Sequence, residues 1–280
     1  MSRPRALTVF LAVATLAGCL ALAVAAQIPL SPVRDAGQTV TPAYEGWYPN
    51  EDGTFTLSFG YFNRNREEIL DIPVGPNNFM APGRQDLGQP TRFHPQRHWG
   101  VFTVKVPADF GNGEVVWTLV NRGQTFAIPG HLRSEWLLDA KLDLASNNTP
   151  PALKFAPSGP EGRGPDGITT GPVEARVGDP LSLTLWATDD EIGRENPFRP
   201  QPAKIMLMWF KHSGPGDVAF ENTEPRADKE NGGKSTTSAT FSAPGDYVLR
   251  VRANDLSGNI SGGHAQCCWT NGYVKVTVSE

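Results

Sequence analysis

The chain is poor in cysteine and has no long run of helical periodicity. Three cysteines occur in 280 residues, and one of them, Cys19, lies in the apolar N-terminal segment. So few cysteines exclude a scaffold built on several disulfides. Glycine and proline are frequent instead, with 29 and 25 residues, and they separate short alternating runs of apolar and polar residues. This sequence pattern is typical of strands joined by turns, so an all-β chain is predicted.

Positive charge is also scarce. The first 26 residues contain two arginines and no acid, and without them 23 basic residues stand against 29 acidic ones, a formal charge of −6. Surfaces that bind nucleic acid are basic. No nucleic-acid partner is therefore expected.

Motifs of nucleophilic and zinc-dependent catalysis are lacking as well. Neither G-x-S-x-G nor Ser-x-x-Lys occurs in a strand-to-helix setting, and HExxH does not occur. Carboxylate pairs that cleave glycosidic bonds are defined by their separation in space, which a sequence does not give. A non-enzymatic protein without a resident cofactor is predicted.

Residues 1–26 have the features of an export signal. Arg3 and Arg5 precede a continuous apolar run that ends in small residues before Gln27. Two alternatives compete with simple cleavage: acylation of Cys19, because Leu-Ala-Gly-Cys fits a lipoprotein box, and an uncleaved anchor, because about 20 apolar residues span a bilayer. The expected location is periplasmic or extracellular in a bacterial envelope, with membrane contact only through a lipid anchor.

The chain after this signal divides into two predicted β-sandwich domains. Residues 27–40 lack periodicity and are interpreted as a flexible tether, and residues 41–147 form the first domain. Residues 148–171 are dense in Gly and Pro and are interpreted as a linker, which leaves residues 172–280 for the second domain.

The segment 245–255 gives the most regular strand pattern. Tyr247, Leu249 and Val251 alternate on one side and are predicted to face a core. Their outward neighbours, Val248, Arg250 and Arg252, are predicted to be mostly solvated, as in a half-buried antiparallel strand.

From Val173 onward the chain resembles the PKD-like branch of immunoglobulin-type sandwiches, the group that includes the repeats of egg-jelly-receptor proteins. The matching motifs are Gly178-Asp179 before LSLTLWATD, Trp209 followed by SGPG, Pro244-Gly245-Asp246-Tyr247, and Asp255 before Gly258. The resemblance implies a seven-strand sandwich used for spacing or binding. Two departures are the missing Asp-Phe-Gly-Asp-Gly loop after Trp209 and the cysteine pair before the last strand. The first domain resembles no family that we recognise.

Cys267 and Cys268 are adjacent, and in an oxidising compartment they pair with each other or across chains. The pair is interpreted first as a stiff turn with Trp269 packed beside it, and second as a redox or ligand-contact platform. A third interpretation is a soft-metal site that includes His264. Cys267, Cys268, Trp269 and His264 are therefore the candidate binding residues.

Three acidic residues end two strands of the second domain. Asp189 and Asp190 follow one strand and Asp255 ends another, so they can meet at one pole of the sandwich. Several carboxylate oxygens suit Ca²⁺. Capping of turns by Asp side chains is the favoured alternative.

Histidines and aromatic residues of the first domain offer weaker signals. His94 and His98 flank Pro95, which argues against a helix, and with His131 they give at most a weak metal trio, so exposed loop histidines are expected. Four aromatic residues either stack on sugars or pack in the core, and core packing is favoured. They are Trp47, Tyr48, Tyr61 and Phe62.

Together these features predict an exported binding or scaffold module whose partner is a protein or glycan of the cell envelope. The first alternative is a carbohydrate-binding accessory protein. The second is a small metal or redox protein centred on His264, Cys267 and Cys268.

Overall fold

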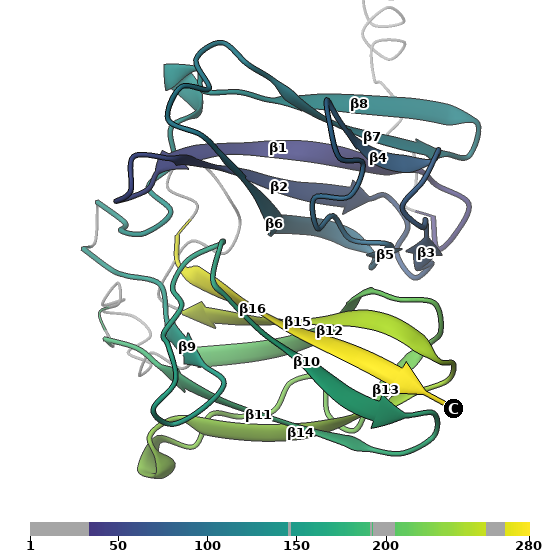
Figure 1. The fold of residues 1–280 in the computed structure, drawn as a ribbon, viewed down its shortest axis with the longest axis vertical. Coiled ribbons are helices and arrows are strands. Elements are labelled where there is room, and N and C mark those ends of the chain that lie inside the picture. The colour runs from purple at the N-terminus through teal and green to yellow at the C-terminus, as the bar shows by residue number, and fades with distance from the viewer. Residues whose placement is uncertain (1–33, 145–146, 191, 193–204, 256–266) are drawn as a thin grey trace, which may run out of the picture. The chain divides into compact units, whose positions relative to one another are not determined.

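The computed structural model describes residues 34–144, 147–190, 192, 205–255 and 267–280 (Figure 1). Backbone contacts set Asp35–Glu280 apart as one compact unit, and the fold below is that of this unit. The predicted export signal and His264 lie outside the described residues. Within the described part, no helix is long and apolar enough to cross a bilayer.

The fold is all-β, as predicted, and its first half is a sandwich. Two three-stranded sheets, β1-β2-β6 and β4-β7-β8, are accompanied by the small sheet β3-β5. The strands are β1 (Val40–Pro49), β2 (Phe55–Asn63), β3 (Leu70–Asp71), β4 (Asn78–Ala81), β5 (Arg92–Phe93), β6 (Gln96–Val106), β7 (Val115–Asn121) and β8 (Gln124–Gly130). A 3₁₀ turn, η1 (Ser134–Trp136), follows.

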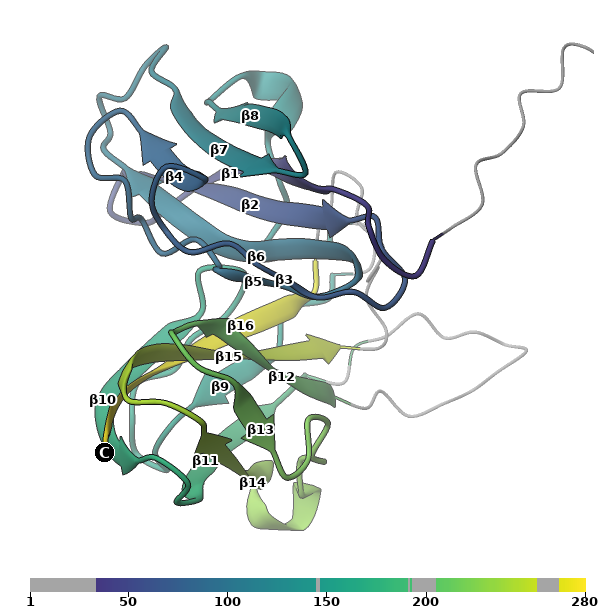
Figure 2. The ribbon, with the colours of Figure 1, turned by 90° about the vertical axis from the view of Figure 1, so that its right-hand side faces the viewer.

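The second half is a sandwich of two four-stranded sheets, β10-β16-β15-β12 and β13-β14-β11-β9 (Figure 2). The strands are β9 (Ala152–Lys154), β10 (Ile168–Arg176), β11 (Leu181–Thr188), β12 (Ile205–Ser213), β13 (Val218–Phe220), β14 (Lys234–Phe241), β15 (Gly245–Asp255) and β16 (Trp269–Ser279), with η2 (Lys229–Asn231) before β14. β10 pairs with β16 in parallel, and the other pairs are antiparallel.

Each sandwich has its own apolar core. In the first, Phe59 stacks on Phe102 and both rings pack around the fully buried Trp117. In the second, Tyr247 packs against Phe241, and its hydroxyl accepts from Gly216 N and donates to the carbonyl of Ala243. The alternation that predicted these strands therefore reflects real core positions.

Two segments that were predicted to lie outside the domains carry structure. The end of the predicted tether lies on the first sandwich, where Gly37 N donates to Glu68 and Gln38 N donates to Asn65, both at 2.7 Å. Within residues 148–171, β9 pairs with β11 and so adds a strand to the second sandwich. The division into two independently folding domains stays a prediction.

One face of β15 differs from its prediction. The inward face, with Tyr247, Leu249 and Val251, is buried as expected. The outward arginines are not solvated: the exposed fractions of Arg250 and Arg252 are 2% and 8%. The prediction was wrong because groups of the first sandwich cover this face of the sheet.

Candidate functional site

A bulge in β6 is the centre of the contact between the two sandwiches. β2 and β6 pair from Phe59–Phe102 on one side and from Tyr61–His98 on the other, so Gly60 faces three residues of β6. Because of this bulge, the carbonyls of those three residues do not form the regular hydrogen bonds of the β2–β6 ladder. Those residues are Trp99, Gly100 and Val101.

Side chains of the second sandwich donate to all three carbonyls. Arg252 Nη1 donates to Trp99 O at 3.1 Å, Asn271 Nδ2 to Gly100 O at 2.7 Å, and Tyr273 Oη to Val101 O at 2.9 Å. We call this set of three hydrogen bonds the carbonyl lock. Because buried backbone oxygens are costly when unpaired, the lock replaces the ladder bonds that the bulge removes.

Gly100 is required by this arrangement. Its φ of +49° lies in the left-handed region, and a Cβ there would stand 2.7 Å from Cζ2 of Trp269. Trp269 in turn stacks with Arg252, whose guanidinium carbon lies 4.4 Å from the ring centroid. Arg252 also donates to Asn254 Oδ1 at 2.7 Å, so its guanidinium is fixed on several sides.

Arg250 is the second buried cation of this face. It lies 4.7 Å above the Phe210 ring and donates to Asn271 Oδ1 at 3.2 Å, but its Nε has no hydrogen-bond partner among the described residues. Burial lowers the pKa of Arg250, and burial together with the Arg250 charge lowers the pKa of Arg252 to about 9. Both guanidinium groups are still cations at neutral pH.

Three histidines surround these cations. His94 and His98 pack edge-on against Phe210, with ring centroids 5.2 and 5.6 Å away, and His212 packs against Tyr273 at 5.6 Å. Burial is the main cause, and the Arg250 charge the second, of pKa values lowered to about 4 for His94 and about 3 for His98 and His212. The expectation of exposed loop histidines was wrong for His94 and His98, because the second sandwich covers them.

His131 lies elsewhere. Its ring packs against Tyr44 at 5.0 Å and against Trp136 at 5.9 Å. Across the described residues, no group of three or more His, Cys, Asp or Glu side chains could hold a metal ion.

The cysteine pair forms a disulfide and is buried. Cys267 and Cys268 are bonded to each other, and each is only 1% exposed. Their sulfurs lie 3.8 and 3.6 Å from the carbonyl oxygen of Asn148. Trp269 is equally buried, so these three residues are packed inside the unit, and a role in ligand contact stays a prediction.

The three candidate calcium ligands have different surroundings. Asp255 is fully buried and accepts from Asn148 Nδ2. Asp190 accepts from Thr149 Oγ1 at 2.7 Å and from Ile192 N at 3.0 Å, a turn-capping bond of the kind that the sequence favoured. Asp189 lines a surface pocket. A calcium site at this pole stays a prediction.

The aromatic candidates are mostly packed. Tyr61 and Tyr48 are 1% and 2% exposed, and Trp47 packs edge-on against Phe55. Phe62 is the exposed member of the four, at 41%. Core packing is thus confirmed for Tyr48 and Tyr61, which leaves no row of exposed rings among these four residues.

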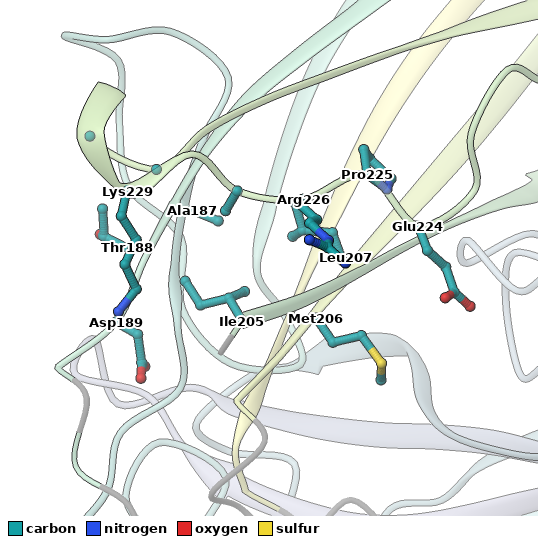
Figure 3. A pocket seen from close by; sticks show the side chains of 13 residues that line it. Ala187, Thr188, Asp189, Ile205, Met206, Leu207, Glu224, Pro225, Arg226 and Lys229 are labelled. Atoms are coloured by element: carbon teal, nitrogen blue, oxygen red, sulfur yellow. The ribbon is translucent and has the colours of Figure 1, made fainter. Parts of the chain in front are cut away.

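A pocket of about 560 Å³ opens at the side of the second sandwich (Figure 3). One wall is the start of β12, with Ile205, Met206 and Leu207, and the facing wall is the segment Glu224–Ala227. The end of β11 and residues around η2 complete the lining. The pocket therefore combines apolar side chains with the charged groups of Glu224, Arg226, Lys229 and Asp189.

Neither the carbonyl lock nor this pocket was predicted from the sequence. Arg252, Asn271 and Tyr273 have the polarity of surface residues, and their acceptors are backbone atoms, which no residue type marks. The one signal that could have pointed to the lock was Gly100 within a strand pattern, since an isolated glycine there suggests a bulge or a close approach.

Comparisons with known proteins give distant likenesses of structure. No family model matches the chain, and no curated protein matches it. Domains 4 and 5 of the S-layer protein SbsC are 10% identical, over 60% of this chain and 66% of that chain, with a TM-score of 0.24. The D00–D0 domains of intimin are 9% identical, over 85% and 100%, with a TM-score of 0.26. The adhesin InvE of Yersinia pseudotuberculosis is 11% identical, over 85% and 58%, with a TM-score of 0.24. Likenesses with such low scores do not bear on function, which has to be inferred from this chain's own residues.

Proposed function

We propose that this chain is an exported, non-enzymatic binding or scaffold module of the bacterial envelope. The observation that carries the proposal is the carbonyl lock, whose three hydrogen bonds join two sandwiches with separate cores. Hydrogen bonds from side chains of one sandwich to backbone carbonyls of the other restrict rotation of the two sandwiches against each other. A fixed pair of sandwiches is suited to presenting a surface at a set distance and angle.

Other contacts beside the lock support the same role. The backbone carbonyl of His212 accepts a hydrogen bond from Thr91 N at 2.9 Å. Nε2 of the His212 ring lies 2.8 Å from the carbonyl oxygen of Gly88. Arg92 binds Asp217 at 3.0 Å and Asp71 at 2.8 Å, so a charged link crosses the outer part of this contact. Contacts at several points resist bending better than one contact does.

Export is supported by the N-terminal pattern and by the state of the cysteines. An apolar run with two leading arginines precedes small residues at positions 23–26. The disulfide between Cys267 and Cys268 suits an oxidising compartment. We assign the second sandwich to the PKD-like group, on its Pro-Gly-Asp-Tyr turn and the Tyr247 hydroxyl that holds it.

Two measurements test the proposal. The full chain with a C-terminal tag, produced in a Gram-negative host, should fractionate outside the cytoplasm, and its intact mass should show a start at Gln27 or an acylated Cys19. In the purified protein, residual dipolar couplings from the two sandwiches should fit one alignment tensor. Unprocessed chain in the cytoplasm would refute export, and two different tensors would refute the fixed scaffold.

A further inference from the structure

Among the described residues, no strand pairs with the edge of β12 that borders the pocket. Trp209 N donates away from the sheet, to the carbonyl of Thr223 at 2.8 Å. Asp255 N donates to the carbonyl of Cys268, the residue just before β16. The backbone N–H and C=O groups of Asp255 and of alternate residues along β15 therefore point toward β16 and not toward β12. Both observations show which backbone N–H and C=O groups of β12 point toward β15 and which point toward the open edge.

The register extends this direction to the start of the strand. Ile205 pairs with Asp255, Leu207 with Ala253 and Trp209 with Val251, with no bulge between them. Backbone groups alternate in an antiparallel ladder, so the N–H and C=O of Leu207 and Ile205 point outward like those of Trp209. Within the described residues these two backbones have no hydrogen bond on that side.

The facing segment leaves room for a strand. After Thr223, residues Glu224–Ala227 form the facing wall, and the pocket lies between them and the start of β12 (Figure 3). Leu207 is buried, and Ile205 packs against the core of the second sandwich. A strand added beside β12 would therefore continue the sheet and direct alternate side chains into the pocket, against Leu207 and Pro225.

Arg226 adds a charge preference at the rim of the pocket. It is exposed and makes no ion pair with the described residues. Lys229 and Asp189 take part in other interactions. Glu224, the exposed acid of the same lining, makes no ion pair with the described residues either. Of these two charges Arg226 is the cation, and a carboxylate placed beside it would be complementary.

We propose that this pocket binds an extended segment of a partner protein by strand addition to β12. The segment places one apolar side chain in the pocket and an acidic side chain next to Arg226, and its backbone pairs with Ile205 and Leu207. The proposal deepens the binding role proposed above, because it gives that role a site and a class of partner.

The first measurement concerns the edge itself. In amide hydrogen exchange of the full chain, Leu207 should exchange fast while Met206 and Met208, which face β15, are protected. The probe for binding is a displayed library of random seven-residue peptides. Enriched peptides should combine an apolar with an acidic residue and should protect the Leu207 amide when bound.

Matched variants localise the binding. Ile205→Pro removes an outward N–H at the first residue of β12, where proline is tolerated, and should weaken a selected peptide roughly tenfold. Ile205→Val keeps the N–H and should bind like the parent chain. Arg226→Gln should weaken the same peptide severalfold, whereas Arg176→Gln, on exposed β10, should not. Methylation of a single backbone nitrogen of the peptide should abolish binding when that N–H pairs with β12, which is the case for every second residue, and should have little effect at the residues between.

Several results would overturn the proposal. They are a slowly exchanging Leu207 amide, a library without enriched peptides, binding unaffected by Ile205→Pro, or a chain that dimerises through β12 and so has itself as partner. Any of them leaves the exported scaffold standing if fractionation and dipolar couplings support it. Conversely, peptide binding by a chain that stays in the cytoplasm would refute the proposed function and not the site.

Discussion

Gly100 combines a left-handed backbone with a close contact to the side chain of Trp269 in the other sandwich. In Gly100→Ala, the left-handed φ costs roughly 1–2 kcal/mol and the contact of the new methyl with Trp269 roughly a further 1–3 kcal/mol. Gly123→Ala is the control, because Gly123 also has a positive φ but nothing within 4 Å of its Cβ position. Urea unfolding should show the larger loss for Gly100→Ala, and equal losses would contradict the contact.

Three histidines at the contact between the sandwiches, one buried and two half-buried, predict how stability depends on pH. His94, His98 and His212 have pKa values of about 3 to 4 when folded, against about 6.5 when unfolded. The unfolded chain binds more protons in this window, so stability is fully present above pH 6.5 and falls as the pH drops. Between pH 6 and 4.5 each histidine contributes a slope of up to about 1.4 kcal/mol per pH unit. Urea unfolding of His94→Gln should show a smaller slope, and an unchanged slope would refute this account.

Arg250 and Arg252 should respond differently to replacement by methionine. Arg250 Nε has no hydrogen-bond partner in the described part of the chain, so Arg250→Met should change stability little, because removing a buried charge offsets the lost hydrogen bond to Asn271. Arg252→Met leaves the Trp99 carbonyl unpaired and should cost about 1–3 kcal/mol. Removing the Arg250 charge should also raise the pKa values of the three histidines, which NMR titration of the imidazoles measures. Unmoved histidine pKa values would show that burial alone sets them.

For the strand β15, the sequence predicted the face that packs in the core but not the opposite face. Alternation of Tyr247, Leu249 and Val251 was enough to find β15 and its core side, because that periodicity is local. Its other side is covered by Trp99–Val101, which lie far away along the chain and contribute backbone atoms. Polar residues that bind carbonyls have the same composition as solvated ones, so the interface was missed.

The disulfide just before β16 should be slow to react in the folded protein. Both cysteines are 1% exposed and lie against the Asn148 carbonyl, so a reductant such as dithiothreitol reaches them only when this end of the strand opens. Reduction followed by alkylation and mass measurement should be slow in buffer and should accelerate steeply in urea below the unfolding midpoint. Rapid reduction without urea would show that the pair is accessible, which would strengthen the ligand-contact interpretation.

At the scale of the whole unit, the carbonyl lock joins two cores that are each complete. The first core is centred on Phe59 and Trp117 and the second on Leu185 and Val251, and every side chain of either core comes from one sandwich. We therefore propose two folding domains that unfold together only because the lock couples them. Calorimetry should show one transition for the parent chain. The variant that combines Arg252→Met, Asn271→Ala and Tyr273→Phe should show two, since separate cores keep separate enthalpies of unfolding. A single transition shifted to lower temperature in that variant would mean that neither sandwich is stable without the other, and that the boundary in residues 148–171 separates strands and not domains.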